Sequence, residues 1–165
     1  MRTIQKRRRR ENRTDYLARL KMLRSGKPRL VFRKTNKHII SQYVVSEEAK
    51  DKIILGITSK KLLDYGWPES FKGSLKSIPA AYLTGYLMAK KIQEKKLETP
   101  IVDFGMMRKL HKSKLFAFLK GFIEGGIKIN CKEEAFPEEE RIEGKSLKED
   151  FSKHFNEIKS KIDKE

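Results

Sequence analysis

The first 37 residues carry most of the positive charge of this 165-residue chain, and this restricts where a core can form. They hold fifteen Lys or Arg residues against two acids, a net charge of 15 − 2 = +13 out of +17 for the chain. Residues 38–131 hold 16 basic and 9 acidic residues (+7), and residues 132–165 hold 8 and 11 (−3). Like charges repel each other when a chain compacts, and a segment with this much positive charge therefore resists burial in a core. We expect a basic arm with a short helix at 1–27, an α/β domain at 28–131, and an acidic turn with a C-terminal helix at 132–165.

The kind of cation in this segment narrows the choice of partner. Ten of the fifteen are Arg, whose planar guanidinium binds phosphate oxygens in pairs and stacks on bases. A dense basic patch of this kind favours nucleic acid as the partner. A solvated targeting or solubility tail and an anionic membrane surface are the alternatives.

The remaining composition limits the class of protein. A hydrophobic content of 38% over 165 residues supports one domain of ordinary size with extensions. No apolar run approaches the length of a membrane span, and no secretory signal is visible, so we expect a cytosolic or nuclear protein. Cys131 stands alone, and His38, His111 and His154 lack ligand-like spacing, so we expect neither disulfide, metal nor cofactor.

A short helix is predicted within the arm. Asn12 is expected to cap it, with Asp15 reaching back as in a capping box, and Gly26 and Pro28 end it. A helix of about two and a half turns is too short to persist alone, so it must dock on the domain or on a partner. Its apolar side chains recur at helical spacing: Tyr16, Leu17, Leu20 and Leu23.

Three β-rich runs follow in residues 30–32, 39–45 and 53–57, and they predict an antiparallel meander. The turn between the first two contains Asn36, a residue that tolerates positive φ. A short helix is expected at Lys60 to Tyr65, and then a loop leading to Ile78.

The next segments predict two long helices around one strand. Pro79 suits the first turn of a helix that runs to Lys96. A buried strand is expected at Ile101 to Gly105, then a helix ending at Gly125 or Gly126, and an edge strand at 127–129. The order βββαβα implies an α/β layer fold with a mixed sheet.

The last segment predicts an amphipathic helix from Ser146 onward. Its apolar stripe consists of Leu147, Phe151, Phe155, Ile158 and Ile162. This stripe needs a partner, either the chain's own domain or a neighbouring protein. Its acidic surroundings argue against RNA.

Several ordered motifs together resemble one family. These are RRRRENRTDYLARLKMLRSGKPRLVFRKTNKHIISQ, PAAYLTGYL, VDFGM, KLFAFLKGFIEGGI and EEERIEG. With these motifs the chain resembles the archaeal form of the large-subunit ribosomal proteins that bind 5S ribosomal RNA, universal L-eighteen, over about residues 5–145. The segment from Lys148 and the loop from Trp67 to Ile78 inherit nothing from the resemblance.

The resemblance implies a three-layer α/β domain with a mixed sheet. It also implies a structural role in the cytoplasmic ribosome, in the central protuberance of the large subunit. The implied partners are 5S rRNA, large-subunit rRNA and neighbouring ribosomal proteins.

The candidate RNA-binding residues combine the arm with the tip of the first hairpin. Arg side chains of the arm suit phosphates, and short polar groups on the turn can reach sugars and base edges. His38 either contacts RNA or bonds within the turn. The set is Arg7, Arg8, Arg9, Arg10, Arg13, Arg19, Lys21, Arg24, Lys27, Arg29, Arg33, Lys34, Thr35, Asn36, Lys37 and His38.

Other candidate residues have a competing structural interpretation. Tyr65 and Trp67 could stack on an unpaired base but fit a core better. Thr84 and Gly85 suit a close helix contact better than a ligand.

Two other functions compete with the ribosomal one. A metal-dependent nucleic-acid enzyme would need Asp103, Asp64 and Glu124 to converge on a cation, and since Asp103 is equally explained by a turn, we expect no catalytic residues. A general basic DNA- or RNA-binding protein explains the arm but not the ordered motifs.

Overall fold

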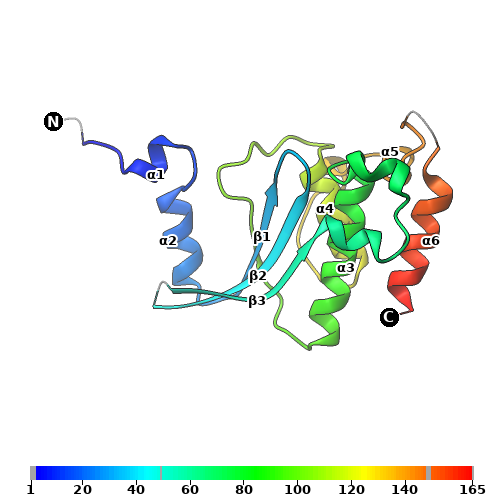
Figure 1. The fold of residues 1–165 in the computed structure, drawn as a ribbon. Coiled ribbons are helices and arrows are strands. Elements are labelled where there is room, and N and C mark those ends of the chain that lie inside the picture. Colours follow the sequence, from blue (N-terminus) through cyan, green and yellow to red (C-terminus); the bar gives the residue numbers. More distant parts are fainter. Residues whose placement is uncertain (1–2, 49, 148–149, 165) are drawn as a thin grey trace.

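A mixed four-stranded sheet forms the centre of the molecule (Figure 1). The computed structural model describes residues 3–48, 50–147 and 150–164. Strands β1 (Arg29–Lys34), β2 (Ile39–Glu47) and β3 (Lys50–Thr58) form an antiparallel meander, and β4 (Ile101–Asp103) pairs in parallel with β1. The sheet order is β3-β2-β1-β4. The predicted meander, the βββαβα order and the mixed sheet are confirmed.

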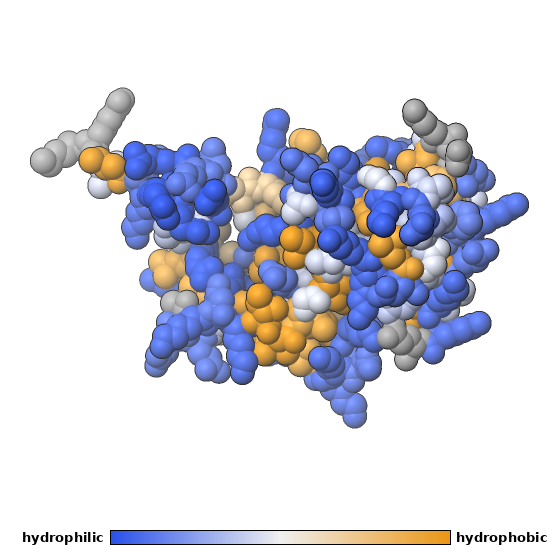
Figure 2. All heavy atoms as spheres, viewed as in Figure 1, coloured by the Kyte–Doolittle hydropathy of each residue, from blue (hydrophilic) through white to orange (hydrophobic). Residues whose placement is uncertain are grey.

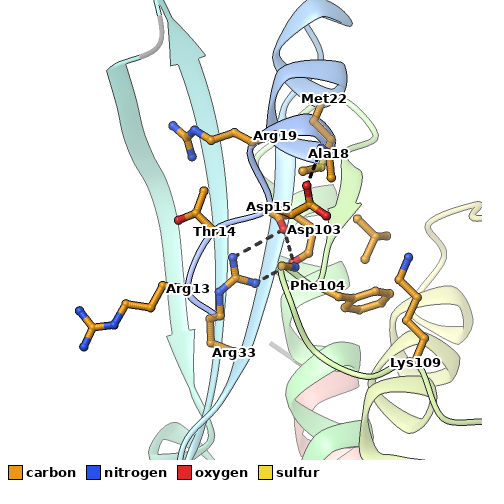
Figure 3. A pocket seen from close by; sticks show the side chains of 12 residues that line it. Arg13, Thr14, Asp15, Ala18, Arg19, Met22, Arg33, Asp103, Phe104 and Lys109 are labelled. Carbon is orange, nitrogen blue, oxygen red and sulfur yellow. Dashed lines mark hydrogen bonds and ion pairs between the residues drawn. The ribbon is translucent and has the colours of Figure 1, made fainter. Parts of the chain in front are cut away.

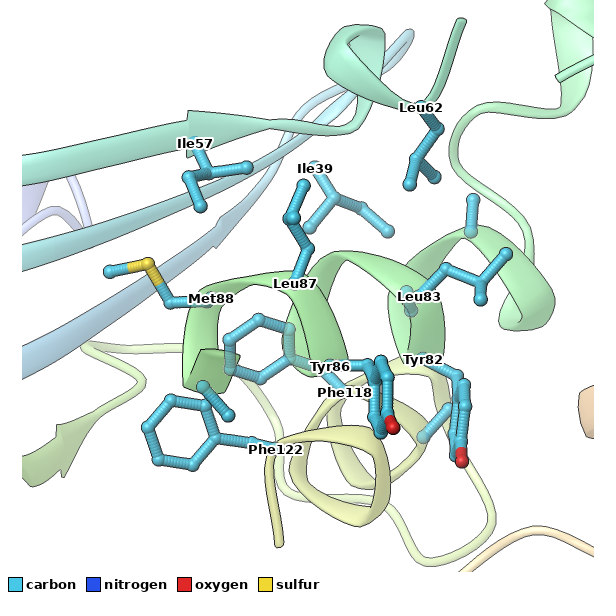
Figure 4. Packing of buried hydrophobic residues seen from close by; sticks show 14 of the residues in the cluster. Ile39, Ile57, Leu62, Tyr82, Leu83, Tyr86, Leu87, Met88, Phe118 and Phe122 are labelled. Carbon is cyan, nitrogen blue, oxygen red and sulfur yellow. The ribbon is translucent and has the colours of Figure 1, made fainter. Parts of the chain in front are cut away.

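Two long helices cover one face of this sheet. Helix α3 (Ile78–Glu94) starts at Ser77, whose side chain accepts a hydrogen bond from the N–H of Ala80, with Pro79 in the first turn. Helix α4 (Lys114–Glu124) packs along α3. Because the sheet, α4 and the C-terminal helix all contact α3, 12 of its 17 residues are buried, which explains its broad apolar surface (Figure 4).

Helices α3 and α4 approach each other through two glycines. A Cβ added at Gly85 would overlap the carbonyl oxygen of Phe118, and one at Gly121 would overlap that of Tyr82. The missing side chain at each glycine therefore leaves room for the backbone of the other helix. The close-contact interpretation of Gly85 is confirmed, and Thr84 beside it is fully buried and donates to the carbonyl of Ala80.

The C-terminal helix α6 (Ser152–Asp163) packs back on its own domain. Phe151, Phe155, Ile158 and Ile162 are all buried in the common core. Lys159 Nζ bonds to Tyr82 Oη at 2.8 Å and to Glu124 at 3.2 Å, and Tyr86 donates to Asp163 at 2.5 Å. These bonds join α6 to α3 and α4. The apolar stripe therefore finds its packing partner within the same chain.

Several expected elements are corrected by the structure. Residues 127–129 form no strand, because Ile127 turns into the core instead of pairing at a sheet edge. The expected helix at Lys60 is a 3-10 helix (Ser59–Leu63) that ends before Gly66, whose φ is +97°. Helix α6 begins at Ser152 and not at Ser146; residues 148–149 lie outside the described part.

Short helical turns connect the larger elements. They are the 3-10 helices Glu69–Ser74 and Glu133–Ala135 and helix α5 (Glu139–Glu143), which Gly144 ends with φ of +86°. Among the described helices, none has the length and apolar character needed to cross a bilayer.

Replacing Gly85 by Ala is expected to destabilise the fold by about 1–3 kcal/mol, because the added methyl group forces α3 and α4 apart. The free energy of unfolding from urea titration measures this change. Gly73→Ala is the control, since nothing lies within 4 Å of a Cβ there. Equal stability of the two variants would contradict the close helix contact.

Candidate nucleic-acid interface

The arm forms two helices beside the sheet face that α3 and α4 leave open. Helix α1 (Arg7–Arg10) consists of the four-arginine run, and α2 (Tyr16–Arg24) follows it (Figure 1). Asp15 caps α2 by accepting the N–H groups of Leu17 and Ala18. The expected capping role of Asn12 is therefore wrong: its φ of +52° places it in the turn that ends α1.

Most cations of the arm project into solvent. Hydrophilic atoms dominate the surface over α1 and α2 in Figure 2. Neither helix contains a buried residue, and Leu17 is 65% exposed. Within the described chain, no carboxylate lies within salt-bridge distance of Arg10, Lys21, Arg24 or Lys27. These side chains are free to neutralise phosphates.

The other arm cations make weak internal contacts. Arg7 and Arg13 face Glu11 at 3.8 and 3.3 Å, and Arg8 bonds to the hydroxyl of Thr14 at 3.0 Å. Arg9 contacts the sulfur of Met106 at 2.8 Å. Exposed pairs of this kind contribute at most about 1 kcal/mol, so RNA phosphates can displace them.

A buried arginine, Arg29, connects the four strands on the open face of the sheet. Its guanidinium lies 2.7 Å from Asp51 of β3, 3.1 Å from Asp103 of β4 and 3.1 Å from Ser46 of β2. The side chains of Arg29 and Asp103 are only 3% and 7% exposed. The sequence predicts RNA binding by Arg29, but this burial gives it a structural role instead.

The same carboxylates position two arginines that remain partly exposed. Arg19 of α2 pairs with Asp51 at 2.9 Å, which fixes α2 to the sheet. Arg33 of β1 lies 3.6 Å from Asp103 and donates to the carbonyl oxygens of Phe32 and Asp103 (Figure 3). These contacts hold both guanidiniums in place. An anion that binds them therefore costs less side-chain entropy than one that binds a freely moving arginine.

A small pocket of about 120 Å³ separates α2 from the sheet. It is lined by Arg13, Asp15 and Arg19 of the arm together with Arg33 and Lys109 (Figure 3). The arm and the first hairpin therefore present their cations on one surface. Such a group of cations has the chemistry to bind anions.

Hydrogen bonds of Thr35 close the hairpin tip. The Thr35 hydroxyl donates to the carbonyl of His38 at 2.8 Å and accepts the N–H of His38 at 2.9 Å. Asn36 and Lys37 are left exposed at the end of the turn. Asn36 has no positive φ, so the suggested use of that conformation is wrong. Burial, with Lys60 and then Lys37, lowers the pKa of His38, so its imidazole is neutral at pH 7.

The remaining candidate residues have structural roles. Tyr65 and Trp67 belong to the hydrophobic core, as their sizes suggested. Asp103 caps the turn at Gly105 and pairs with Arg29, whereas Glu124 bonds to Tyr82 and Lys159. Among the residues the structure describes, no group of His, Cys, Asp or Glu has the arrangement of a metal site.

The interface also includes cations that the candidate set omitted. Lys109 lines the pocket beside α2, and Arg108 and Lys114 lie close to Lys34 of the hairpin. The basic run RKLHKSK between β4 and α4 signalled these residues in the sequence, but only folding brings it to the hairpin.

Comparison with known proteins gives the family. The sequence pattern of the ribosomal large-subunit proteins 60S L5 and 50S L18 matches residues 2–100. The chain belongs to this family. A large ribosomal subunit protein uL18 of Korarchaeum cryptofilum is 42% identical over 141 residues, covering 86% of this chain and 70% of the relative.

Two further uL18 proteins are similar to the chain. That of Methanoregula boonei is 40% identical over 86% of this chain and 79% of its own length. That of Methanothermobacter thermautotrophicus is 35% identical over 96% and 94%. As a member of this family, the chain is a structural constituent of the large ribosomal subunit and not an enzyme.

Replacing Asp51 by Asn is expected to reduce stability in a pH-dependent way. Burial raises the pKa of Asp51, but hydrogen bonds from Ser46, Arg19 and Arg29 outweigh it, so the pKa lies below 3.8. A depressed carboxyl pKa stabilises the fold above the unfolded value and ceases to do so as the pH falls through the folded value.

The stability difference between wild type and Asp51→Asn should therefore be complete above pH 3.8 and shrink below it. Urea titrations at a series of pH values measure this difference. Glu69→Gln, at an exposed carboxylate without an ion pair within the described residues, is the control. A stability difference that does not change with pH would contradict a stabilising role for the negative charge of Asp51.

Proposed function

We propose that this chain binds 5S rRNA and helps to attach it to the large-subunit rRNA in the central protuberance. The observation that carries the proposal is the shared surface on which Arg13 and Arg19 of the arm meet Arg33 of the hairpin. The longest motif that resembles the 5S-binding proteins, RRRRENRTDYLARLKMLRSGKPRLVFRKTNKHIISQ, spans these two segments. Neighbouring ribosomal proteins complete the proposed set of partners.

The two parts of the surface support different contributions to binding. The exposed arm cations neutralise phosphates, which gives affinity with little dependence on sequence. The tip at Asn36 and Lys37 offers short polar groups for sugars and base edges, which give specificity. Double-stranded RNA hides its base edges in a narrow groove, so phosphates, 2′-hydroxyls and exposed loop bases are the accessible features.

The proposed RNA-binding set is the arm and the hairpin without Arg29. The set keeps Thr35, which holds the turn through hydrogen bonds to the backbone of His38. It also keeps His38, whose imidazole has a lowered pKa. The proposal includes no cofactor and no catalytic residue.

The direct test compares binding to 5S rRNA, an unrelated structured RNA of equal length and duplex DNA at one salt concentration. We expect 5S rRNA to bind tighter by about tenfold or more, about 1.4 kcal/mol. Equal affinity for all three would leave a general basic nucleic-acid-binding protein as the function.

Binding through the arm should depend steeply on salt. We expect a log–log slope of about −4 to −7, from roughly 6 to 8 neutralised phosphates. Replacing Arg7, Arg8 and Arg10 by Gln should make the slope shallower by about 2 to 3 and leave stability unchanged, since none is buried.

The matched control for the arm removes three exposed lysines elsewhere, Lys95, Lys96 and Lys128. They lie at and beyond the C-terminal ends of α3 and α4. A control variant that lowers the slope as much as the arm variant would show that the effect is net charge alone.

The hairpin tip should affect discrimination more than salt dependence. Asn36→Ala with Lys37→Ala keeps Thr35 and so keeps the turn. We expect the affinity ratio between 5S rRNA and the unrelated RNA to fall, while the arm variant preserves this ratio. An unchanged ratio would exclude the tip as the source of specificity.

A further inference from the structure

A second concentration of cations lies where the hairpin, the start of α3 and the start of α4 meet. A pocket of about 390 Å³ opens there. Its lining contains five cations and no carboxylate: Lys34, Arg108, Lys112, Lys114 and Arg141. Apart from Lys112, which pairs with Glu138 at 2.7 Å, none of them has a salt-bridge partner in the described part of the chain.

Lys114 is the most confined of these cations. Burial lowers the pKa of its ammonium, and the nearby charges of Lys34 and Lys76 lower it further. Lys34 of the hairpin and Lys114 in the first turn of α4 line this pocket together, and Lys76, in the segment before α3, is near enough to act on Lys114 electrostatically. An anion placed between them would relieve this repulsion.

The start of α4 adds donors to the same pocket. The hydroxyl of Ser113 is buried and has no hydrogen-bond partner, and it does not cap the helix. No acidic residue occupies the first turn of α4. The first N–H groups of an α-helix have no partner within the helix, so they also favour an anion.

We infer that Lys34, Arg108 and Lys114, with Lys76 nearby, form a second phosphate-binding site that holds an RNA backbone, separate from the arm. The inference rests on the proposed function, because it takes RNA as the anion. Three things favour RNA over a single small anion: the spread of the cations over three elements, the open pocket and its continuity with the arm.

The continuity is visible in the contacts of the loop between β4 and α4. Arg9 of α1 touches Met106, Lys109 lines the pocket beside α2, and Arg108 lines this second pocket. A backbone strand that leaves the arm can therefore pass over residues 105–109 to reach Lys114. The apolar floor formed by Ile78, Met107, Leu110 and Leu115 suits the sugar or base faces of such a strand.

The test replaces Arg108 and Lys114 by Gln in the full chain and measures binding to 5S rRNA and to a generic duplex RNA over a salt series. We expect the log–log slope to become shallower by about 2 on both RNAs, about one for each phosphate that is no longer neutralised. Lys95→Gln with Lys128→Gln is the control with the same charge, and it should retain most of the slope.

The outcomes separate this inference from the proposed function. Equal affinity for both RNAs with a shallower slope in the variant overturns 5S specificity and supports the site. An unchanged slope on both RNAs overturns the site, even if 5S rRNA is preferred. A slope lowered equally by the control also overturns it.

A second measurement uses the unaltered protein. Lysine acetylation followed by mass spectrometry, with and without RNA, reports which amines RNA covers. We expect Lys34, Lys76 and Lys114 to be protected and Lys95 and Lys128 to stay reactive. Protection confined to the arm lysines would show that the pocket stays empty, and protection by an acidic peptide but not by RNA would assign it to a protein partner.

Discussion

The position of Arg29 is the constraint on which the basic surface depends. A buried guanidinium is costly unless carboxylates and hydrogen-bond acceptors surround it, and here Asp51, Asp103 and Ser46 do so from three other strands. The same two carboxylates hold Arg19 and Arg33 at the edge of the network. One buried charge cluster therefore joins the sheet to α2 and fixes the cations that face solvent.

Opposite charges are separated along the molecule. Positive charge gathers on α1, α2, the hairpin and the start of α4, whereas the acidic segment from residue 132 packs beside α3. The polar links between α6 and the domain include Lys159 with Glu124 and Tyr86 with Asp163. The acidic segment therefore completes the core, and two of its carboxylates, Glu138 and Glu139, pair with Lys112 and Lys120. Two large apolar side chains of β3, Ile53 and Ile54, are also exposed.

Local patterns determined much of the fold. The alternating β-rich runs, the Pro79 start, the Gly125–Gly126 stop and the apolar stripe of α6 each depend on neighbouring residues, so they could be predicted together with the βββαβα order. Helix ends depended on more than their own residues. Asp15 and Asn12 are both good capping residues, and the turn after α1 decided between them. Ile127 looked like strand, but its side chain packs into the hydrophobic core, and it pairs with none of the four strands of the described sheet.

The sequence by itself determined the charge and the family resemblance, and it supplied the candidate RNA-binding residues, because these follow from residue type and order. Only the tertiary structure decided which cations are free. Arg29 and Arg10 are alike in sequence, yet one is enclosed by carboxylates from distant strands and the other faces solvent. Likewise Lys34, Lys76 and Lys114 lie far apart in the chain and meet only when the hairpin packs beside α3 and α4. Burial and long-range electrostatics depend on the distances between segments, and the folded sheet and helices set those distances.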